Sequence, residues 1–363
     1  MTESTKKKET VVVAMSGGVD SSVTAALLKE QGYNVIGITL QLLPPEITSF
    51  GERKCCGIEN IEDAKYVAAM LKIPHYVFNM RKAFKKYVID NFIAEYMRGR
   101  TPNPCIRCNR FIKFHVLANK AKQIGAHYVA TGHYARIEYN RERGLYELKK
   151  GIDSSKDQSY FLYELTQEQM RSTLMPLGTW FKAEVREKAR ELGLPVYSKS
   201  DSQEICFVSG KDYREVFTRF SENPLKPGLI LDLEGNIIGT HNGIANYTIG
   251  QRRGLNISSD KPLYVIKIDP EKNAIVVGPR KYGYHRILLV KHPIWPSERP
   301  ELPKKAWVKI RSIHIPSEAM LTEENSGVKV EFKEPQWAVT PGQSAVFYDN
   351  DLVLGGGIIE YGE

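Results

Sequence analysis

The residues Thr10–Met15 and Ser16–Ser22, which read TVVVAM and SGGVDSS, decide the fold of the first part of this chain. TVVVAM is a near-continuous apolar run, which is typical of a central strand buried on both faces of a parallel sheet. SGGVDSS is a polar loop with two glycines, and a helical pattern follows it from about Ser22 to Gln31. The order of strand, loop and helix indicates an α/β domain with a parallel sheet.

The same alternation of short strands and helices continues over about the first 200 residues. Further strands are expected at 34–40, 75–78 and 128–131, and helices at 58–71, 81–97 and 111–124. The prolines and the glycine of GRTPNPCIRCN, residues 99–109, predict a segment without regular structure.

The residue pattern changes after about residue 208, where glycines and prolines separate short runs that are apolar or alternate between apolar and polar residues. Such a pattern predicts β-structure, and we expect a β-barrel in the last third of the chain. Asp349-Asn350-Asp351 reads as a hairpin turn. The predicted domains are therefore 1–208, a small central domain at 209–285, and a C-terminal domain at 286–363.

The composition narrows the class of protein. The chain has 363 residues, 42% of them hydrophobic, and a formal net charge of +9. It contains no run of about 18 apolar residues and no apolar signal-peptide core, so we expect a soluble, cytoplasmic protein without a membrane partner. The basic charge suits a polyanion such as RNA.

The loop SGGVDSS has the features of a phosphate-binding site. Two glycines let the backbone turn sharply, and the N-terminus of the following helix favours an anion. The serine hydroxyls add donors, and Asp20 is suited to hold Mg²⁺ beside the phosphates. The sequence contains neither G-x-x-x-x-G-K-[ST] nor G-x-G-x-x-G after a strand, which argues against a Walker-type or dinucleotide site.

The five cysteines, an odd number, disfavour a secreted disulfide framework. Cys105 and Cys108 form a C-x-x-C, and Cys206 is about a hundred residues away. Arg107 and a helix start predict a lowered pKa for Cys108. Four roles remain open for these thiols: they are unreactive, they bind a structural zinc ion, they carry out persulfide chemistry, or all three hold an iron–sulfur cluster.

Two adjacent cysteines, Cys55 and Cys56, follow residues 43–53, which read as a mobile loop beside the phosphate site. We interpret this pair as structural or adventitious rather than catalytic.

Beyond these local patterns, SGGVDSS resembles the PP-loop of the ATP pyrophosphatases. Over residues 10–362 the chain resembles the tRNA-specific 2-thiouridylases of the MnmA type. The resemblance rests on AMSGGVDSS (14–22), GRTPNPCIRCN (99–109), TGHYAR (131–136), KDQSYFL (156–162), DSQEICF (201–207), YTIGQRRGL (247–255) and AVTPGQSAVFY (338–348).

The resemblance implies a Rossmann-like PP-loop domain, a small central tRNA-binding domain and a C-terminal β-barrel. It implies ATP and Mg²⁺ as cofactors and the tRNAs for Lys, Glu and Gln as substrates. Members adenylate O2 of the wobble uridine and replace this oxygen with sulfur. A sulfur-carrier protein or a cysteine desulfurase is the implied sulfur donor.

The resemblance also assigns roles to residues of this sequence. The ATP site would contain Ala14, Met15, Ser16, Gly17, Gly18, Val19, Asp20 and Ser21, with Leu40 and Gly132 at the adenine and ribose. The target base would meet Asn103, Pro104 and Cys105. Cys108 would be the nucleophile, Cys206 would carry the persulfide, and Asp20 would assist catalysis. The tRNA would contact His133, Lys156, Asp157, Gln158, Arg311, Ser312 and Gln343.

Two positions depart from the family pattern. The best-known members have Met where this chain has Leu40, which is a conservative change, and Asp where it has Cys105. The additional thiol keeps a [4Fe–4S] cluster on Cys105, Cys108 and Cys206 as the alternative to a persulfide. Another tRNA-modifying ATP pyrophosphatase with a nitrogen nucleophile, such as a lysidine synthetase, and an RNA-binding protein with a vestigial loop are the rival functions.

Overall fold

The computed structural model describes residues 9–43, 58–201, 205–208, 212–221, 224–325 and 327–362. The predictions for residues 44–53 and for Cys55 and Cys56 concern residues outside these ranges. The chain packs as two compact units. The first unit contains residues 1–87, 105–210 and 351–353, and the second contains residues 88–104, 211–350 and 354–363.

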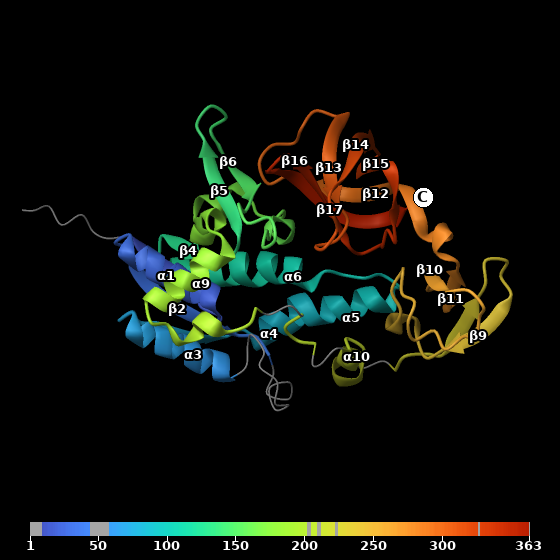
Figure 1. Ribbon diagram of the computed structural model, residues 1–363, viewed down its shortest axis with the longest axis horizontal. Coiled ribbons are helices and arrows are strands. Elements are labelled where there is room, and N and C mark those ends of the chain that lie inside the picture. The colour runs from blue at the N-terminus through green and yellow to red at the C-terminus, as the bar shows by residue number, and fades with distance from the viewer. Residues whose placement is uncertain are drawn as a thin grey trace, which may run out of the picture. The chain divides into compact units, whose positions relative to one another are not determined.

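The first unit is built on a parallel sheet in the strand order β3-β2-β1-β4-β7 (Figure 1). Its strands are β1 (Thr10–Ala14), β2 (Asn34–Gln41), β3 (His75–Asn79), β4 (Tyr128–Ala130) and β7 (Thr173–Leu174). This sheet confirms the predicted fold class. The apolar run after Glu9 therefore forms the middle strand, with β2 on one side and β4 on the other.

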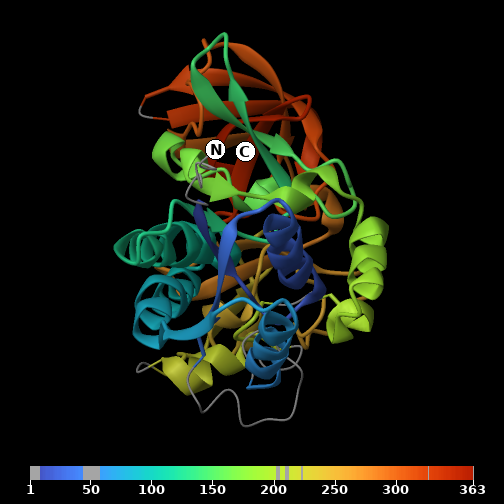
Figure 2. The ribbon, with the colours of Figure 1, turned by 90° about the vertical axis from the view of Figure 1, so that its left-hand side faces the viewer.

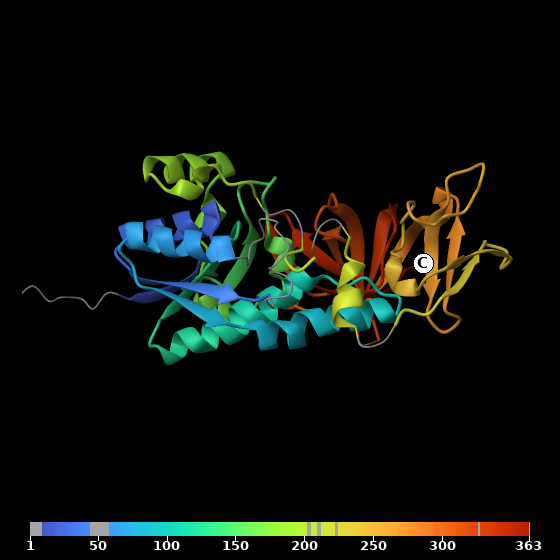
Figure 3. The same ribbon diagram turned by 90° about the horizontal axis from the view of Figure 1, so that it is seen from below.

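Helices cover both faces of this sheet (Figure 3). Val11 and Val13 of β1 belong to the same buried cluster as residues of α1 (Val19–Glu30), α3 (Ile58–Met70) and α9 (Lys182–Glu191). Val12 points the other way and packs with Leu117 and Ala121, which belong to η2 (Cys108–Leu117) and α7 (Ala118–Gln123). Both faces of β1 are buried, which explains why its three central residues are all valines.

The segment 99–109 is partly helical, so the prediction of an irregular segment is wrong for its second half. Pro104 starts α6 (Pro104–Arg107), which continues directly into η2. A proline is favourable in the first helical turn because its missing N–H has no partner there. Upstream, the predicted helix at 81–97 is present as α4 (Arg81–Phe84), η1 (Lys85–Ile89) and α5 (Asp90–Met97).

The first unit also contains an antiparallel hairpin that the sequence analysis did not predict. It consists of β5 (Ala135–Asn140) and β6 (Leu145–Lys150), and it projects beyond the sheet of the first unit (Figure 1; Figure 2). The remaining helical turns of this unit are η3 (Ser159–Phe161), α8 (Gln167–Arg171), η4 (Pro176–Thr179) and η5 (Pro195–Ser198).

The second unit contains a small sheet and a barrel. The small sheet has the order β10-β11-β8-β9, from β8 (Gly228–Leu231), β9 (Ile237–His241), β10 (Tyr264–Asp269) and β11 (Ala274–Gly278). Short helices accompany it at α10 (Glu215–Phe220), η6 (Ile244–Asn246) and η7 (Arg280–Gly283).

The barrel confirms the predicted β-structure of the last third. Its order is β12-β15-β14-β13-β16-β17, and pairing of β12 with β17 closes it. The strands are β12 (Tyr284–Ile294), β13 (Lys304–Lys309), β14 (Ser317–Glu324), β15 (Gly327–Trp337), β16 (Ser344–Asp349) and β17 (Leu352–Gly362). Asn350 has φ +55° in the turn between β16 and β17, as the predicted hairpin requires. Among all described residues, no helix is long and apolar enough to cross a membrane.

Candidate active site

The glycine loop lies where the strand order of the parallel sheet reverses. From β1 the chain passes to β2 and β3 on one side, and it then returns to β4 on the other side of β1. Ligands of open α/β sheets bind at the carboxyl ends of the strands at such a point. Gly132, which follows β4, is packed so tightly that a Cβ there would lie 2.9 Å from the carbonyl carbon of Asp20. The loops after β1 and β4 therefore meet.

Hydrogen bonds within the loop fix its shape. The backbone N–H of Ser16 donates to Oγ of Ser21 at 3.0 Å, and the Ser22 hydroxyl donates to the carbonyl of Gly18 at 2.9 Å. Helix α1 begins at Val19, three residues earlier than the sequence analysis predicted. Asp20 and Ser21 consequently belong to its first turn, where backbone N–H groups have no intrahelical partner and favour an anion.

Gly17 occupies a conformation that requires glycine. Its φ is +73°, and a Cβ at this position would lie 2.1 Å from the carbonyl oxygen of Asn60 in α3. The ammonium of Lys199 ties the two elements together, because it donates to the Gly17 carbonyl at 3.0 Å and to the side chain of Asn60. It also pairs with Asp63 of α3 at 2.6 Å.

The other residues predicted at the ATP site lie near the loop in the fold. Ala14 ends β1, and Met15 is buried between β1 and the loop. Leu40 lies near the carboxyl end of the neighbouring strand β2 and packs, half-buried, against the core that contains Val12 and Ile38.

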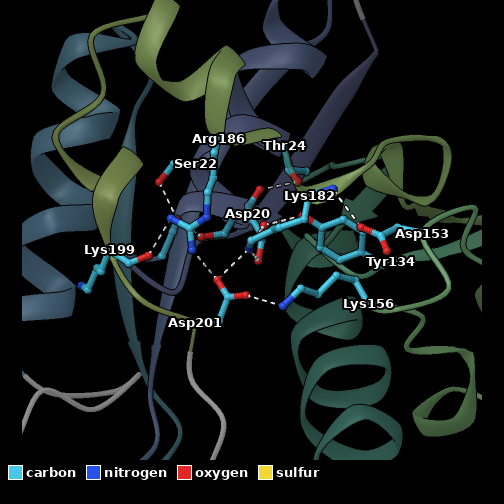
Figure 4. Close-up of polar contacts among 12 residues, drawn as sticks. Asp20, Ser22, Thr24, Tyr134, Asp153, Lys156, Lys182, Arg186, Lys199 and Asp201 are labelled. Carbon is cyan, nitrogen blue, oxygen red and sulfur yellow. Dashed lines mark hydrogen bonds and ion pairs between the residues drawn. The ribbon is translucent and has the colours of Figure 1, made fainter. Parts of the chain in front are cut away.

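A buried lysine faces the loop. Lys182 is 8% exposed, and its ammonium donates to both carboxylate oxygens of Asp20, at 2.7 and 2.8 Å (Figure 4). The hydroxyl of Tyr134 donates to Oδ1 of Asp20 at 2.7 Å, and the Tyr134 ring lies 5.6 Å from the ammonium. Burial and the neighbouring Asp20 carboxylate raise the pKa of Tyr134, so this phenol remains a donor.

Asp201 joins Lys182 to further cations. Its Oδ1 lies 2.9 Å from the ammonium of Lys182 and 2.8 Å from the guanidinium of Arg186, and its Oδ2 accepts from Lys156 at 2.8 Å. Burial acts to raise the pKa of Asp201, but the hydrogen bonds from Lys156 and Lys182 lower it to about 2. The carboxylate therefore stays charged and binds the three cations of Lys182, Arg186 and Lys156 near Asp20 (Figure 4).

The three thiols predicted to act in sulfur chemistry all belong to the first unit. Cys108 is buried at the start of η2, Cys105 is exposed on α6, and Cys206 is half-buried. Cys206 and Cys105 both lie close enough to Cys108 to raise its pKa electrostatically. Phe207 fixes the segment of Cys206, because its ring packs on Phe84 with the ring centres 5.7 Å apart.

The predicted lowering of the Cys108 pKa is wrong for this arrangement. Burial raises the pKa of Cys108 to about 12, although the charge of Lys113 acts in the opposite direction. The helix begins at Pro104, so Cys108 lies a full turn from the N-terminal N–H groups. The guanidinium of Arg107 donates to the carbonyl of Tyr87 at 2.9 Å and lies over the ring of Phe111.

This environment predicts a steep pH dependence of alkylation at Cys108. Below the pKa the thiolate fraction falls about tenfold per pH unit, so labelling by iodoacetamide should still be rising at pH 10. Lys113→Met removes the cation that favours the thiolate and should slow labelling about threefold to tenfold at every pH. The measurement is peptide mass spectrometry of Cys108 over a pH series.

Lys122→Met is the matched control, since Lys122 is exposed on the same helical segment and should leave the rate unchanged. A Cys108 profile that levels off near pH 8.5 would contradict the burial described here.

The thiols do not fit a metal site. In the described ranges, no group of three His, Cys, Asp or Glu side chains is arranged to hold a metal ion. Cys105, Cys108 and Cys206 lie within these ranges, so the structure gives no support to the iron–sulfur alternative or to a structural zinc site on them.

The residues predicted to meet the target base lie where α6 begins. The amide of Gln343 donates to the carbonyls of Thr101 and Pro102, at 3.0 and 3.4 Å, and so fixes the two residues before Asn103. Arg100 is held just upstream by a bidentate ion pair with Glu360, at 2.7 and 2.9 Å. Within the second unit, Gln343 therefore positions the backbone that leads to Asn103 and Pro104.

The residues predicted to contact tRNA fall into both units, and several of their side chains make internal bonds. Gln158 accepts from the N–H of Tyr134 at 3.0 Å, and Asp157 accepts from the Ser159 hydroxyl at 2.9 Å. Lys156 pairs with Asp201. These three side chains thus organise the loop between β6 and η3.

His133 is buried rather than presented to solvent. Its Nδ1 is 2.7 Å from the Thr131 hydroxyl, and its Nε2 is 3.3 Å from the Lys113 ammonium. Burial and the charge of Lys113 hold the pKa of His133 well below its usual range, so the ring is neutral. In the second unit, Arg311 and Ser312 lie between β13 and β14, where Arg311 donates to the carbonyl of Trp337 at 3.4 Å.

Sequence reasoning missed most of the charged residues around Asp20. Tyr134 and Asp201 lie inside the motifs TGHYAR and DSQEICF, so their positions in these motifs could have indicated them. Lys182, Arg186 and Lys199 lie in segments without a motif, and they reach the loop only through the fold.

Comparison with known proteins places this site in a family. Residues 9–210 match the family described as the tRNA methyl transferase HUP domain. Residues 221–279 match its PRC-barrel domain, and residues 285–359 match the aminomethyltransferase beta-barrel domain. A tRNA-specific 2-thiouridylase MnmA of Heliobacterium modesticaldum is 52% identical over 97% of this chain and 92% of its own length. The chain belongs to the tRNA-specific 2-thiouridylase family.

Other members of the 2-thiouridylase family match over a similar extent. The protein named MnmA 1 from Caldanaerobacter subterraneus subsp. tengcongensis is 51% identical over 96% of this chain and 97% of its own length. The MnmA of Pelotomaculum thermopropionicum is 50% identical over 98% of both chains. Membership of this family implies ATP and Mg²⁺ as cofactors. The carboxylate of Asp20 and the N–H groups at the start of α1 suit these ligands.

Proposed function

We propose that this chain converts the wobble uridine, position 34, of the tRNAs for Lys, Glu and Gln into 2-thiouridine. Membership of the 2-thiouridylase family supports the activity of a tRNA-uridine 2-sulfurtransferase. The observation that carries the proposal is that Cys108 and Cys206 belong to the same compact unit as the glycine loop. The glycine loop and the two thiols therefore lie in one compact unit, which is compatible with two half-reactions on one substrate.

The first half-reaction activates the base. O2 of the uridine attacks the α-phosphate of ATP, pyrophosphate leaves, and the oxygen becomes part of an AMP leaving group. The loop and the start of α1 neutralise the phosphates through N–H groups and hydroxyls. Mg²⁺, when bound, adds positive charge beside Asp20. The hydroxyl of Tyr134 donates a hydrogen bond to Oδ1 of Asp20.

The second half-reaction transfers sulfur from a persulfide on Cys206. The terminal sulfur attacks C2 of the adenylated uridine, and AMP leaves with the former O2. The Cys108 thiol loses its proton and attacks Sγ of Cys206, which breaks the S–S bond and yields a disulfide between the two cysteines. In an alternative order, Cys108 attacks first and releases hydrosulfide, which then attacks C2. A cytoplasmic sulfur-carrier protein or cysteine desulfurase supplies the persulfide.

The remaining parts of the chain serve to hold the tRNA. We propose residues 1–208 as the catalytic domain, 209–285 as a central linker that also binds tRNA, and 286–363 as the barrel domain. Asn103, Pro104 and Cys105 would receive the base. Arg311, Ser312 and Gln343 would contact the tRNA from the second unit, and His133, Lys156, Asp157 and Gln158 would do so from the first.

A reaction with two tRNA transcripts tests this function. The chain is incubated with ATP, Mg²⁺, a cysteine desulfurase with cysteine, and tRNA-Lys with either U34 or C34. We expect U34 to gain the mass of a sulfur-for-oxygen exchange, with one AMP released per product, and C34 to remain unchanged. AMP release that depends on ammonia or an amino acid instead of the sulfur source would overturn the proposal in favour of a nitrogen-transferring enzyme.

A further inference from the structure

Lys182 stands at a position that disfavours a cation. It is the first residue of α9, where the positive end of the helix dipole repels a positive charge, and it is 8% exposed. A buried ammonium is stable only when carboxylates or other acceptors replace its water. Asp20 and Asp201 supply these acceptors, at 2.7, 2.8 and 2.9 Å.

The partners of Lys182 connect it to the phosphate loop. Asp20 lies in the first turn of α1, directly after the glycines, and both of its carboxylate oxygens accept from Lys182. These oxygens are the ones that a divalent cation would need. A cation at Asp20 and the Lys182 ammonium therefore compete for the same atoms.

Asp201 differs from Asp20 because it has other cations. The charged groups of Arg186 and Lys156 each lie 2.8 Å from the carboxylate of Asp201. The negative charge of Asp201 therefore stays neutralised even when Lys182 changes its position. Arg186 is itself held by the carbonyls of Tyr197 and Lys199, at 2.8 and 3.0 Å. Asp201 is thus a fixed anchor that keeps the Lys182 ammonium at the loop.

We propose that Lys182 is a phosphate-binding residue that exchanges partners when the nucleotide binds. Without nucleotide it neutralises Asp20. When Mg²⁺–ATP enters, Asp20 turns to the metal, and Lys182, still anchored by Asp201, moves its charge to the phosphates. A lysine suits this exchange because its ammonium is a compact charge on a flexible stem. The inference rests on the proposed use of ATP.

The exchange predicts opposite effects of one substitution on two ligands. Lys182→Met should weaken binding of Mg²⁺ with a non-hydrolysable ATP analogue by about tenfold or more, because a phosphate contact is lost. It should strengthen binding of Mg²⁺ alone about threefold, because the competitor at Asp20 is gone. Isothermal titration without tRNA measures both affinities.

Lys188→Met is the matched control. Lys188 lies on the same helix, and its ammonium pairs with Glu30 at 3.1 Å. Both affinities should be unchanged in this variant. A purely structural role of Lys182 would lower the two affinities together or leave the ATP analogue unaffected, and either result overturns the proposal.

A measurement on the unmodified chain covers the case in which Lys182→Met fails to fold. An acyl-phosphate derivative of ATP transfers its acyl group to a lysine amine near the phosphates and releases ATP. We expect peptide mass spectrometry to find the amide on Lys182, and excess ATP to suppress it. Labelling confined to other lysines would overturn the inference.

These outcomes separate the inference from the proposed function. A chain that binds ATP through Lys182 but forms no 2-thiouridine would contradict only the proposed function. A chain that thiolates tRNA while Lys182→Met keeps the affinities of the unmodified chain would contradict only the role of Lys182.

Discussion

Cys206→Ala and Cys108→Ala are each expected to lower 2-thiouridine formation by at least about 10³-fold, because either change removes a thiol that handles the transferred sulfur. The hydrogen bonds described above join residues of the glycine loop to one another, from Ser16 to Ser21 and from Ser22 to Gly18, so activation should survive both substitutions. We expect a burst of one pyrophosphate per enzyme with tRNA and ATP, without continued AMP release. Quench-flow analysis of radiolabelled ATP and mass spectrometry of the tRNA measure the two steps.

Cys105 supplies the matched control for these variants. It is exposed on α6, three residues before Cys108, and Cys105→Asp replaces its thiol with a carboxylate. With a persulfide on Cys206, this variant should keep its product yield within about tenfold of the unmodified chain. Loss of product together with protein-bound iron in the unmodified chain would instead establish the cluster mechanism that the thiol geometry does not support.

Gly17→Ala is expected to abolish ATP binding and to destabilise the first unit by about 2–4 kcal/mol. The φ of +73° alone costs a residue with a side chain about 1 kcal/mol. The larger effect comes from the Cβ, which would lie 2.1 Å from the carbonyl oxygen of Asn60 and must push the loop away from α3. Calorimetric titration with an ATP analogue and denaturant unfolding give the two quantities.

Gly32→Ala separates the backbone term from the collision. Gly32 follows α1 with φ +90°, and a Cβ there would meet nothing within 4 Å. This variant should lose only about 1 kcal/mol of stability and should bind the ATP analogue as the unmodified chain does. Equal losses in the two variants would show that the contact with Asn60 has no energetic weight.

The parallel sheet could be predicted from the sequence because its strands are short apolar runs whose neighbours in the chain are amphipathic. The loop after β1 could be predicted because glycines and serines directly after a buried strand are typical of a phosphate-binding turn. The start of α1 was predicted too late. Asp20 and Ser21 look like loop residues, but polar residues are also favoured in a first helical turn.

Other features depend on contacts that a local pattern does not contain. Lys182 and Asp20 are 162 residues apart, and their pairing follows only from the packing of α9 beside α1. The pKa of Cys108 was predicted in the wrong direction because burial is a property of the folded unit. The hairpin of β5 and β6 was missed although both strands alternate in polarity and Gly144, with φ +66°, lies between them.

The pairing of Arg100 with Glu360 has a consequence for the order in which the chain matures. The two residues are separated by 260 positions, and the second unit is assembled from residues 88–104, 211–350 and 354–363. During synthesis, Phe92 and Tyr96 must wait for their aromatic partners Tyr213 and Phe217, and Arg100 must wait for Glu360, which is made 260 residues later. The parallel sheet of the first unit is complete once β7 is made, so a nascent chain can form this sheet while the aromatic side chains of α5 still lack their partners.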